Sequence, residues 1–107
     1  MNRIKNISPK KALGQHFLKD VAAIRRIVAA IPEQVRLMEI GPGTGALTDS
    51  LLPQCNKLVL VEKDDQFASY WLQQANTEPR LTLIHADILK AVEEIVSEYS
   101  PEWVIGN

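Results

Sequence analysis

The first regular pattern in the chain is a stripe of apolar residues at helical spacing, made of Val21, Ile24, Ile27, Val28 and Ile31. This spacing predicts an amphipathic helix that packs its apolar face on a core. Asp20 is the expected N-cap, and Pro32 ends the helix because proline cannot continue it. Arg25 and Arg26 lie outside the stripe, so we expect them on the exposed face.

Short apolar runs alternate with further helical patterns along the rest of the chain. Runs of strand length cover residues 35–40, 57–62 and 81–85, and a fourth begins at residues 103–105. One helix is expected over residues 46–52, the next begins at Asp64 or Asp65, and the last follows Asp87. The last two helices carry the apolar residues Phe67, Tyr70, Trp71 and Leu72, and Ile88, Val92, Ile95, Val96 and Tyr99.

Strands that alternate with helices in this way are typical of βαβ units with right-handed crossovers. The near-continuous apolar run at residues 57–62 is typical of a buried parallel strand. We therefore expect an α/β fold built on a parallel sheet. The last residues, Gly106 and Asn107, close the fourth strand, so we also expect a fragment that lacks the remaining strands and crossover helices.

A cluster of glycines joins the first expected strand to its helix in the segment Gly41-Pro42-Gly43-Thr44-Gly45. Glycines at alternate positions let the backbone turn sharply and approach a ligand closely. A tight turn needed only for packing is the alternative. The spacing departs from G-x-G-x-x-G, the fingerprint of dinucleotide-binding proteins.

Polar residues close each of the other strands. Glu62 lies about twenty residues beyond the first glycine, where a carboxylate can accept both hydroxyls of a ribose. Asp87 could accept the exocyclic amine of an adenine, although it is also the expected N-cap of a helix. Because Gly41, Glu62, Asp87 and Asn107 all fall at carboxyl ends of strands, we expect a site for an adenosine derivative along that edge of the sheet.

Charge is divided unevenly along the chain. Residues 1–26 carry seven basic residues and one acidic residue, a balance of +6, whereas the remainder has a balance of −7. A basic leading segment on an acidic body suggests a polyanionic partner, with Lys10 and Lys11 as candidate contacts. A basic tail that only aids solubility is the alternative.

Length and composition exclude several classes of protein. The 107 residues allow one small domain, and no apolar run approaches the roughly 20 residues that span a bilayer. Cys55 is a lone cysteine and cannot form an internal disulfide, and His16 and His85 show no metal-ligand spacing. We expect a cytoplasmic protein without a structural metal and without a membrane partner.

Two motifs together resemble those of a known family. Lys10-Lys11-Ala12-Leu13-Gly14-Gln15-His16-Phe17-Leu18 precedes Glu39-Ile40-Gly41-Pro42-Gly43-Thr44-Gly45, and this pair looks like the entry motifs of the ribosomal RNA adenine dimethyltransferases, to which the erythromycin-resistance methylases are related. The resemblance covers essentially the whole chain. It implies a Rossmann-like class I fold dependent on S-adenosyl-L-methionine, with the sheet truncated after its fourth strand.

The resemblance also implies roles for particular residues. The implied cofactor contacts are His16 and Leu18 on the methionine side, Gly41 beneath the cofactor, Glu62 at the ribose, Asp87 at the adenine, and Asn107. Asn107 would also open the catalytic Asn-Leu-Pro-Tyr motif of the family. The implied reaction is dimethylation of adjacent adenosines in small-subunit ribosomal RNA, with the small ribosomal subunit as partner.

The chain departs from the family pattern in two respects. The family often has Asn where this chain has His16, and the Leu-Pro-Tyr that should follow Asn107 is absent. We therefore divide the chain into a basic arm with the GQHFL motif, residues 1–19, and the first part of a methyltransferase domain, residues 20–107. The rest of the sheet and a helical RNA-binding domain are expected to be missing, so we expect no activity from the chain alone and self-association through its exposed strand.

Two other functions remain open at this point. A non-catalytic RNA-binding or ribosome-assembly factor could keep the same fold. A nicotinamide-dependent oxidoreductase domain would be compatible with Glu62 but not with the GPGTG loop or the GQHFL arm.

Overall fold

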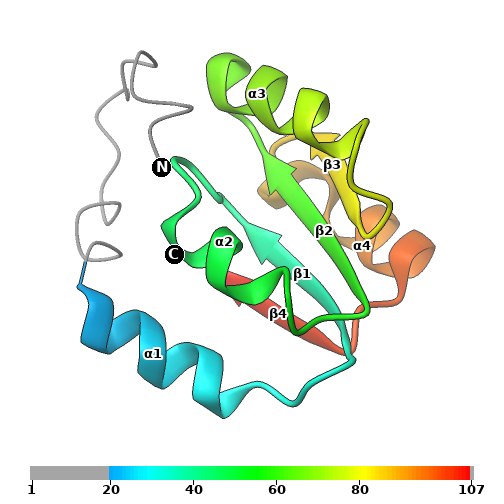
Figure 1. Cartoon of the computed structure of the whole chain (residues 1–107). Helices are drawn as coiled ribbons and strands as arrows, with labels where there is room; N and C mark the ends of the chain where they lie inside the picture. Colours follow the sequence, from blue (N-terminus) through cyan, green and yellow to red (C-terminus); the bar gives the residue numbers. More distant parts are fainter. Residues whose placement is uncertain (1–19, 107) are drawn as a thin grey trace.

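The computed structural model describes residues 20–106; residues 1–19 and Asn107 lie outside the described part. Helices and strands alternate along the chain in the predicted order (Figure 1). The elements are α1 Val21–Ala30, β1 Arg36–Ile40, α2 Ala46–Leu51, β2 Lys57–Glu62, α3 Asp65–Ala75, β3 Leu81–His85, α4 Ile88–Tyr99 and β4 Trp103–Gly106. Within residues 20–106, no helix has the length and apolar character needed to cross a membrane.

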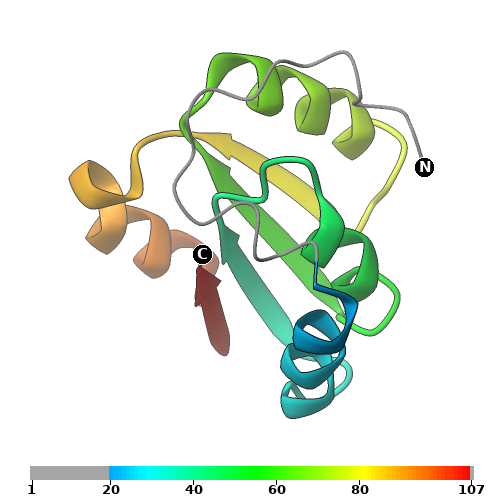
Figure 2. The ribbon, with the colours of Figure 1, turned by 90° about the vertical axis from the view of Figure 1, so that its left-hand side faces the viewer.

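The four strands form one parallel sheet in the order β3-β2-β1-β4. The sheet is covered on both sides: α1, α2 and α3 lie on one face and α4 lies on the other (Figure 2). Alternate residues of the central strands supply the two cores, because successive side chains of a strand point to opposite faces. Leu37 and Leu58 join the larger core, whereas Met38 and Val59 join the smaller one under α4.

Side chains at helix ends hold the helices in place. Asp20 caps α1 by accepting hydrogen bonds from the amides of Ala22 and Ala23, as predicted. Asp64, rather than Asp65, caps α3. These caps satisfy amides that have no partner within their own helix, so each fixes where its helix begins.

Three apolar patterns are less buried than the sequence indicates. On α1 no residue is fully buried, and Val21, the first residue of the predicted stripe, is 59% exposed. Leu72 is 55% exposed, because a residue one position after buried Trp71 projects about 100° further around the helix. On α4, only Ile95 is buried, and Val92 and Val96 are 46% and 37% exposed. The backbone of α4 is also kinked at Ala91, where φ is −137° and ψ is 18°, outside the helical range.

The strand β4 lies at one edge of the sheet. Within the described residues it pairs with β1 and with no other strand. Trp103 and Val104 on this strand are 43% and 50% exposed. An apolar strand edge of this kind is a template for pairing with another chain.

We predict that the 107-residue chain self-associates through β4. Sedimentation velocity should show a mass that increases with protein concentration, and Val104→Lys should shift the chain toward the monomer because a charge opposes edge-to-edge pairing. Leu89→Lys is the matched control, since Leu89 is 87% exposed but lies on α4. A wild-type chain that stays monomeric at all concentrations would contradict the prediction.

Candidate functional site

A glycine loop joins β1 to α2 at the carboxyl end of the sheet. Gly41, Gly43 and Gly45 have φ values of 72°, 55° and 91°, a left-handed region that other residues rarely adopt. The amide of Gly41 donates to the carbonyl of Val61, 2.8 Å away, which ties the start of the loop to β2.

Gly41 and Gly45 are required for different reasons. A Cβ added to Gly41 would meet no atom of residues 20–106 within 4 Å, so with respect to these residues this part of the loop faces open space. A Cβ added to Gly45 would lie 2.5 Å from Cζ2 of Trp71, inside the space that the indole ring occupies. The loop therefore presents backbone to an open site at Gly41 and packs on α3 at Gly45.

Glu62 is a buried carboxylate beside the loop, with 6% of its surface exposed. Its Oε1 accepts a hydrogen bond from the amide of Gly43 at 3.1 Å, and its Oε2 accepts one from the amide of Asp64 at 3.0 Å. A carboxylate offers about four acceptor positions, so each oxygen keeps capacity for another donor. Two oxygens side by side match a pair of neighbouring hydroxyl groups.

Asp87 lies two residues after the end of β3 and caps α4. Its Oδ1 accepts a hydrogen bond from the amide of Leu89 at 3.0 Å, which is the capping role that the sequence left open as an alternative. The amide of Ala86 donates to the carbonyl of Glu62 at 3.0 Å, so the ends of β2 and β3 are joined directly. The role of Asp87 at an adenine ring stays a prediction.

The predicted site residues divide into two groups. The first group lies at the carboxyl ends of the strands, the edge to which the strand arrows point in Figure 1. Gly41 follows β1, Glu62 is the last residue of β2, and Asp87 comes shortly after β3. The remaining predicted residues lie outside the described part of the chain: Lys10, Lys11, His16, Leu18 and Asn107.

Glu39 is a polar residue of this region to which sequence reasoning assigned no role. It lies in β1, is 1% exposed, and its Oε1 accepts a hydrogen bond from the hydroxyl of Thr48 on α2. Burial raises the pKa of Glu39 to about 7; the hydrogen bond from Thr48 opposes the rise, and the charges of Asp49 and Glu62 add to it. The signal in the sequence was a single carboxylate within an apolar strand that leads into the glycine loop.

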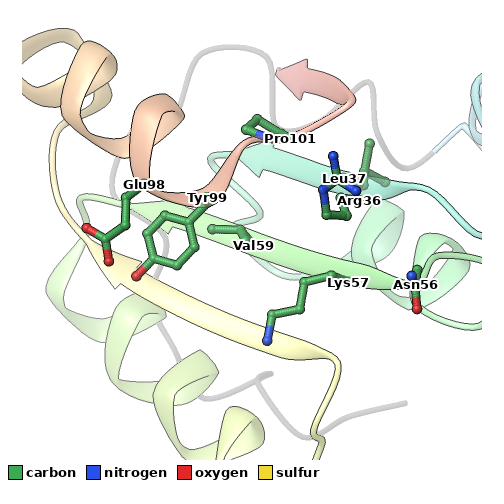
Figure 3. Close-up of a pocket in the computed structure, with 8 residues that line it drawn as sticks. All are labelled: Arg36, Leu37, Asn56, Lys57, Val59, Glu98, Tyr99 and Pro101. Atoms are coloured by element: carbon green, nitrogen blue, oxygen red, sulfur yellow. The ribbon is translucent and has the colours of Figure 1, made fainter.

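A hollow of about 380 Å³ lies at the opposite end of the sheet, where β1 and β2 begin (Figure 3). It is lined by Arg36, Leu37, Asn56, Lys57, Val59, Glu98, Tyr99 and Pro101. The guanidinium of Arg36 already donates to the carbonyl of Ser100 and pairs with Glu102. Ligands of open parallel sheets bind at the carboxyl ends of the strands, so the glycine loop is the better candidate site.

Comparison with known proteins identifies the family to which this chain is related. The family model of the ribosomal RNA adenine dimethylases matches residues 6–99. The chain belongs to this family. The resemblance read from the two sequence motifs is therefore confirmed.

Individual relatives agree with the family assignment. Ribosomal RNA small subunit methyltransferase A of Coxiella burnetii is 39% identical over 106 residues, a match that covers 97% of this chain and 41% of the relative. The chain thus spans about two fifths of the length of this curated relative.

Solved structures of similar proteins share the fold. The 23S rRNA methyltransferase ErmE matches with a TM-score of 0.57 and 27% identity over 67% of this chain and 30% of that one. A dimethyladenosine transferase from Plasmodium falciparum matches with a TM-score of 0.56 and 27% identity over 66% and 27% of the two chains. The predicted class I methyltransferase fold is therefore confirmed.

We predict that Glu39 makes the stability of this family member depend on pH. A carboxyl whose pKa rises from 4.5 to about 7 on folding holds a proton that the unfolded chain releases. The stabilisation is fully present below the unfolded value, about pH 4.5, and is lost as pH rises through about 7. Between pH 4.5 and 8, the wild-type free energy of unfolding should fall by roughly 2–3 kcal/mol relative to Glu39→Gln.

Urea unfolding at several pH values, followed by circular dichroism, measures this difference. Glutamine keeps the acceptor for Thr48 and removes the titration, so its unfolding curve should depend less on pH. Glu94→Gln is the control, because Glu94 is exposed on α4. Equal pH dependence in the wild type and Glu39→Gln would contradict the prediction.

Proposed function

We propose that this chain carries the cofactor-binding part of an enzyme that transfers methyl groups from S-adenosyl-L-methionine to the exocyclic amine of adenine in small-subunit ribosomal RNA. The observation that carries the proposal is the carboxylate of Glu62, held against the glycine loop of a family member at the carboxyl edge of the sheet. The small ribosomal subunit in the cytoplasm is the proposed partner.

The residues at this edge fit the cofactor in chemistry. Glu62 has two buried oxygens that each accept one backbone hydrogen bond, which leaves capacity for the two ribose hydroxyls. The open space at Gly41 lets the backbone approach the ligand without a clash. As the family resemblance implies, Asp87 accepts a hydrogen bond from the exocyclic amine of the adenine ring. His16 and Leu18 contact the methionine part of the cofactor.

Methyl transfer to an amine requires an electrophilic methyl group, which the sulfonium of the cofactor supplies. The protein contributes mainly position and electrostatics. Asn107 accepts a hydrogen bond from the target amine through its side-chain carbonyl, and this favours the pyramidal nitrogen that can attack. The target adenine must be unpaired or flipped out to reach such a site.

RNA binding is assigned to the basic arm at residues 1–19. Lys10 and Lys11 contact phosphates, which bind cations without regard to sequence. The 107 residues alone are expected to be inactive, because the aromatic residue that the family places after Asn107 is not among them. Missing transition-state contacts cannot be replaced by tighter substrate binding.

We predict that Glu62→Ala weakens binding of S-adenosyl-L-methionine by about 1–3 kcal/mol, because this variant has no charged acceptor for the ribose hydroxyls. Isothermal titration calorimetry measures the affinity, with circular dichroism to confirm folding, since Glu62 also holds Gly43 and Asp64. Glu94→Ala on α4 is the matched control and should bind normally. Unchanged affinity in a folded Glu62→Ala variant would count against the assignment.

The same calorimetry and one activity assay separate the competing functions. An oxidoreductase domain would bind a nicotinamide dinucleotide more tightly than S-adenosyl-L-methionine. A chimera that continues from residue 107 with the C-terminal part of the Coxiella burnetii relative should methylate undermethylated small subunits. A chimera that binds cofactor and RNA without methyl transfer would indicate a non-catalytic assembly factor.

We further predict that replacing Lys10 and Lys11 with Gln lowers RNA affinity. The slope of log affinity against log salt should flatten by about 0.7–0.9 for each phosphate that a lysine no longer neutralises. Affinity for the cofactor should stay nearly the same. Lys90→Gln on α4 serves as the control for a lysine outside the arm. An unchanged slope would mean that the arm only aids solubility.

A further inference from the structure

Trp71 connects the middle of α3 to the glycine loop. It is 2% exposed, and its indole Nε1 donates a hydrogen bond to the carbonyl of Gly43 at 3.0 Å. The benzene side of the same ring fills the space beside Gly45, where an added Cβ would lie 2.5 Å from Cζ2 and 2.7 Å from Cη2. One side chain therefore contacts the loop both through a hydrogen bond and through its shape.

Gly43 is held at both of its backbone groups by residues from different elements. Its amide donates to Glu62 at the end of β2, and its carbonyl accepts from Trp71 on α3. Both hydrogen bonds are buried, and each joins residues far apart in sequence. Satisfied buried hydrogen bonds of this kind favour one backbone arrangement. Breaking either bond would leave a buried polar group with neither a protein partner nor water to bond with, which is costly in free energy.

The loop needs such support. Three glycines at positive φ can adopt many other backbone conformations, and ordering them for a ligand costs conformational entropy. A loop already held in its binding conformation avoids that cost when the ligand arrives. Trp71 does not cover Gly41, because no atom of the described residues would lie within 4 Å of a Cβ added there.

We propose that Trp71 is a positioning residue for the glycine loop of the cofactor site: it fixes Gly43 through a hydrogen bond and Gly45 through packing. The identity of the ligand rests on the proposed function, but the contacts between Trp71 and the loop do not depend on it. The same geometry assigns Gly45 to packing against Trp71 and Gly41 to the ligand.

A merely structural role is the competing explanation. Trp71 belongs to the larger core, and its ring meets that of Tyr70 edge-on at 4.8 Å between centroids. Phe67 lies on the same helix, is also 2% exposed and belongs to the same core. Phe67→Leu therefore weakens core packing without removing the Gly43 hydrogen bond, which makes it the matched control for Trp71→Phe.

The first measurement needs no ligand. In the full 107-residue chain, amide hydrogen exchange of the loop glycines is followed by nuclear magnetic resonance in the wild type, Trp71→Phe and Phe67→Leu. We expect exchange in the loop to be about tenfold faster in Trp71→Phe than in Phe67→Leu, once global stability is taken into account. Equal exchange in the two variants would overturn the proposal, whether or not the chain binds the cofactor.

The second measurement connects the loop to binding. Calorimetry with S-adenosyl-L-homocysteine, the demethylated product, should show about three- to tenfold weaker binding to Trp71→Phe, as expected for the removal of one hydrogen bond. Phe67→Leu and Trp103→Phe, which changes the exposed tryptophan on β4, should bind like the wild type. Wild-type affinity in Trp71→Phe would overturn the positioning role.

These two experiments distinguish the failure of this inference from the failure of the proposed function. A wild-type chain that binds no S-adenosyl-L-homocysteine would count against the proposed function, and the exchange measurement would then decide the role of Trp71. A wild-type chain that binds normally, together with a Trp71→Phe variant that also binds normally, would refute the role of Trp71 alone.

Discussion

The site depends above all on the buried carboxylate of Glu62. A carboxylate removed from water is costly unless donors surround it, and here the donors are the amides of Gly43 and Asp64. To provide them, the glycine loop after β1 and the turn before α3 must both converge on the end of β2. The same requirement therefore brings the loop, the strand end and the start of α3 to one edge of the sheet.

Other buried polar interactions complete this arrangement. Thr48 links α2 to Glu39 in β1, and Trp71 links α3 to Gly43 in the loop. By contrast, the ion pair of Arg36 and Glu102 at the far end of the sheet is about half exposed, and such pairs add little to stability. The region around the loop is thus held by hydrogen bonds inside the core, where water cannot compete for the same donors and acceptors.

Geometry and family membership support different parts of the proposed function. The carboxylate of Glu62 and the open backbone at Gly41 explain how a ribose could be bound. The RNA substrate is proposed from the family, and from a basic arm whose phosphate contacts would position an RNA strand but would not select an adenine.

The sequence alone determined the order and type of the elements, the caps of α1 and α4, and the location of Glu62 and Asp87 at strand ends. These features depend on the spacing of neighbouring residues, which sets backbone period and helix starts. Only the tertiary structure decided that Glu39 is buried with a raised pKa and that Trp71 occupies the space beside Gly45. Trp71 and Gly43 are 28 residues apart, and contacts of that range depend on how helices pack on the sheet rather than on any local pattern.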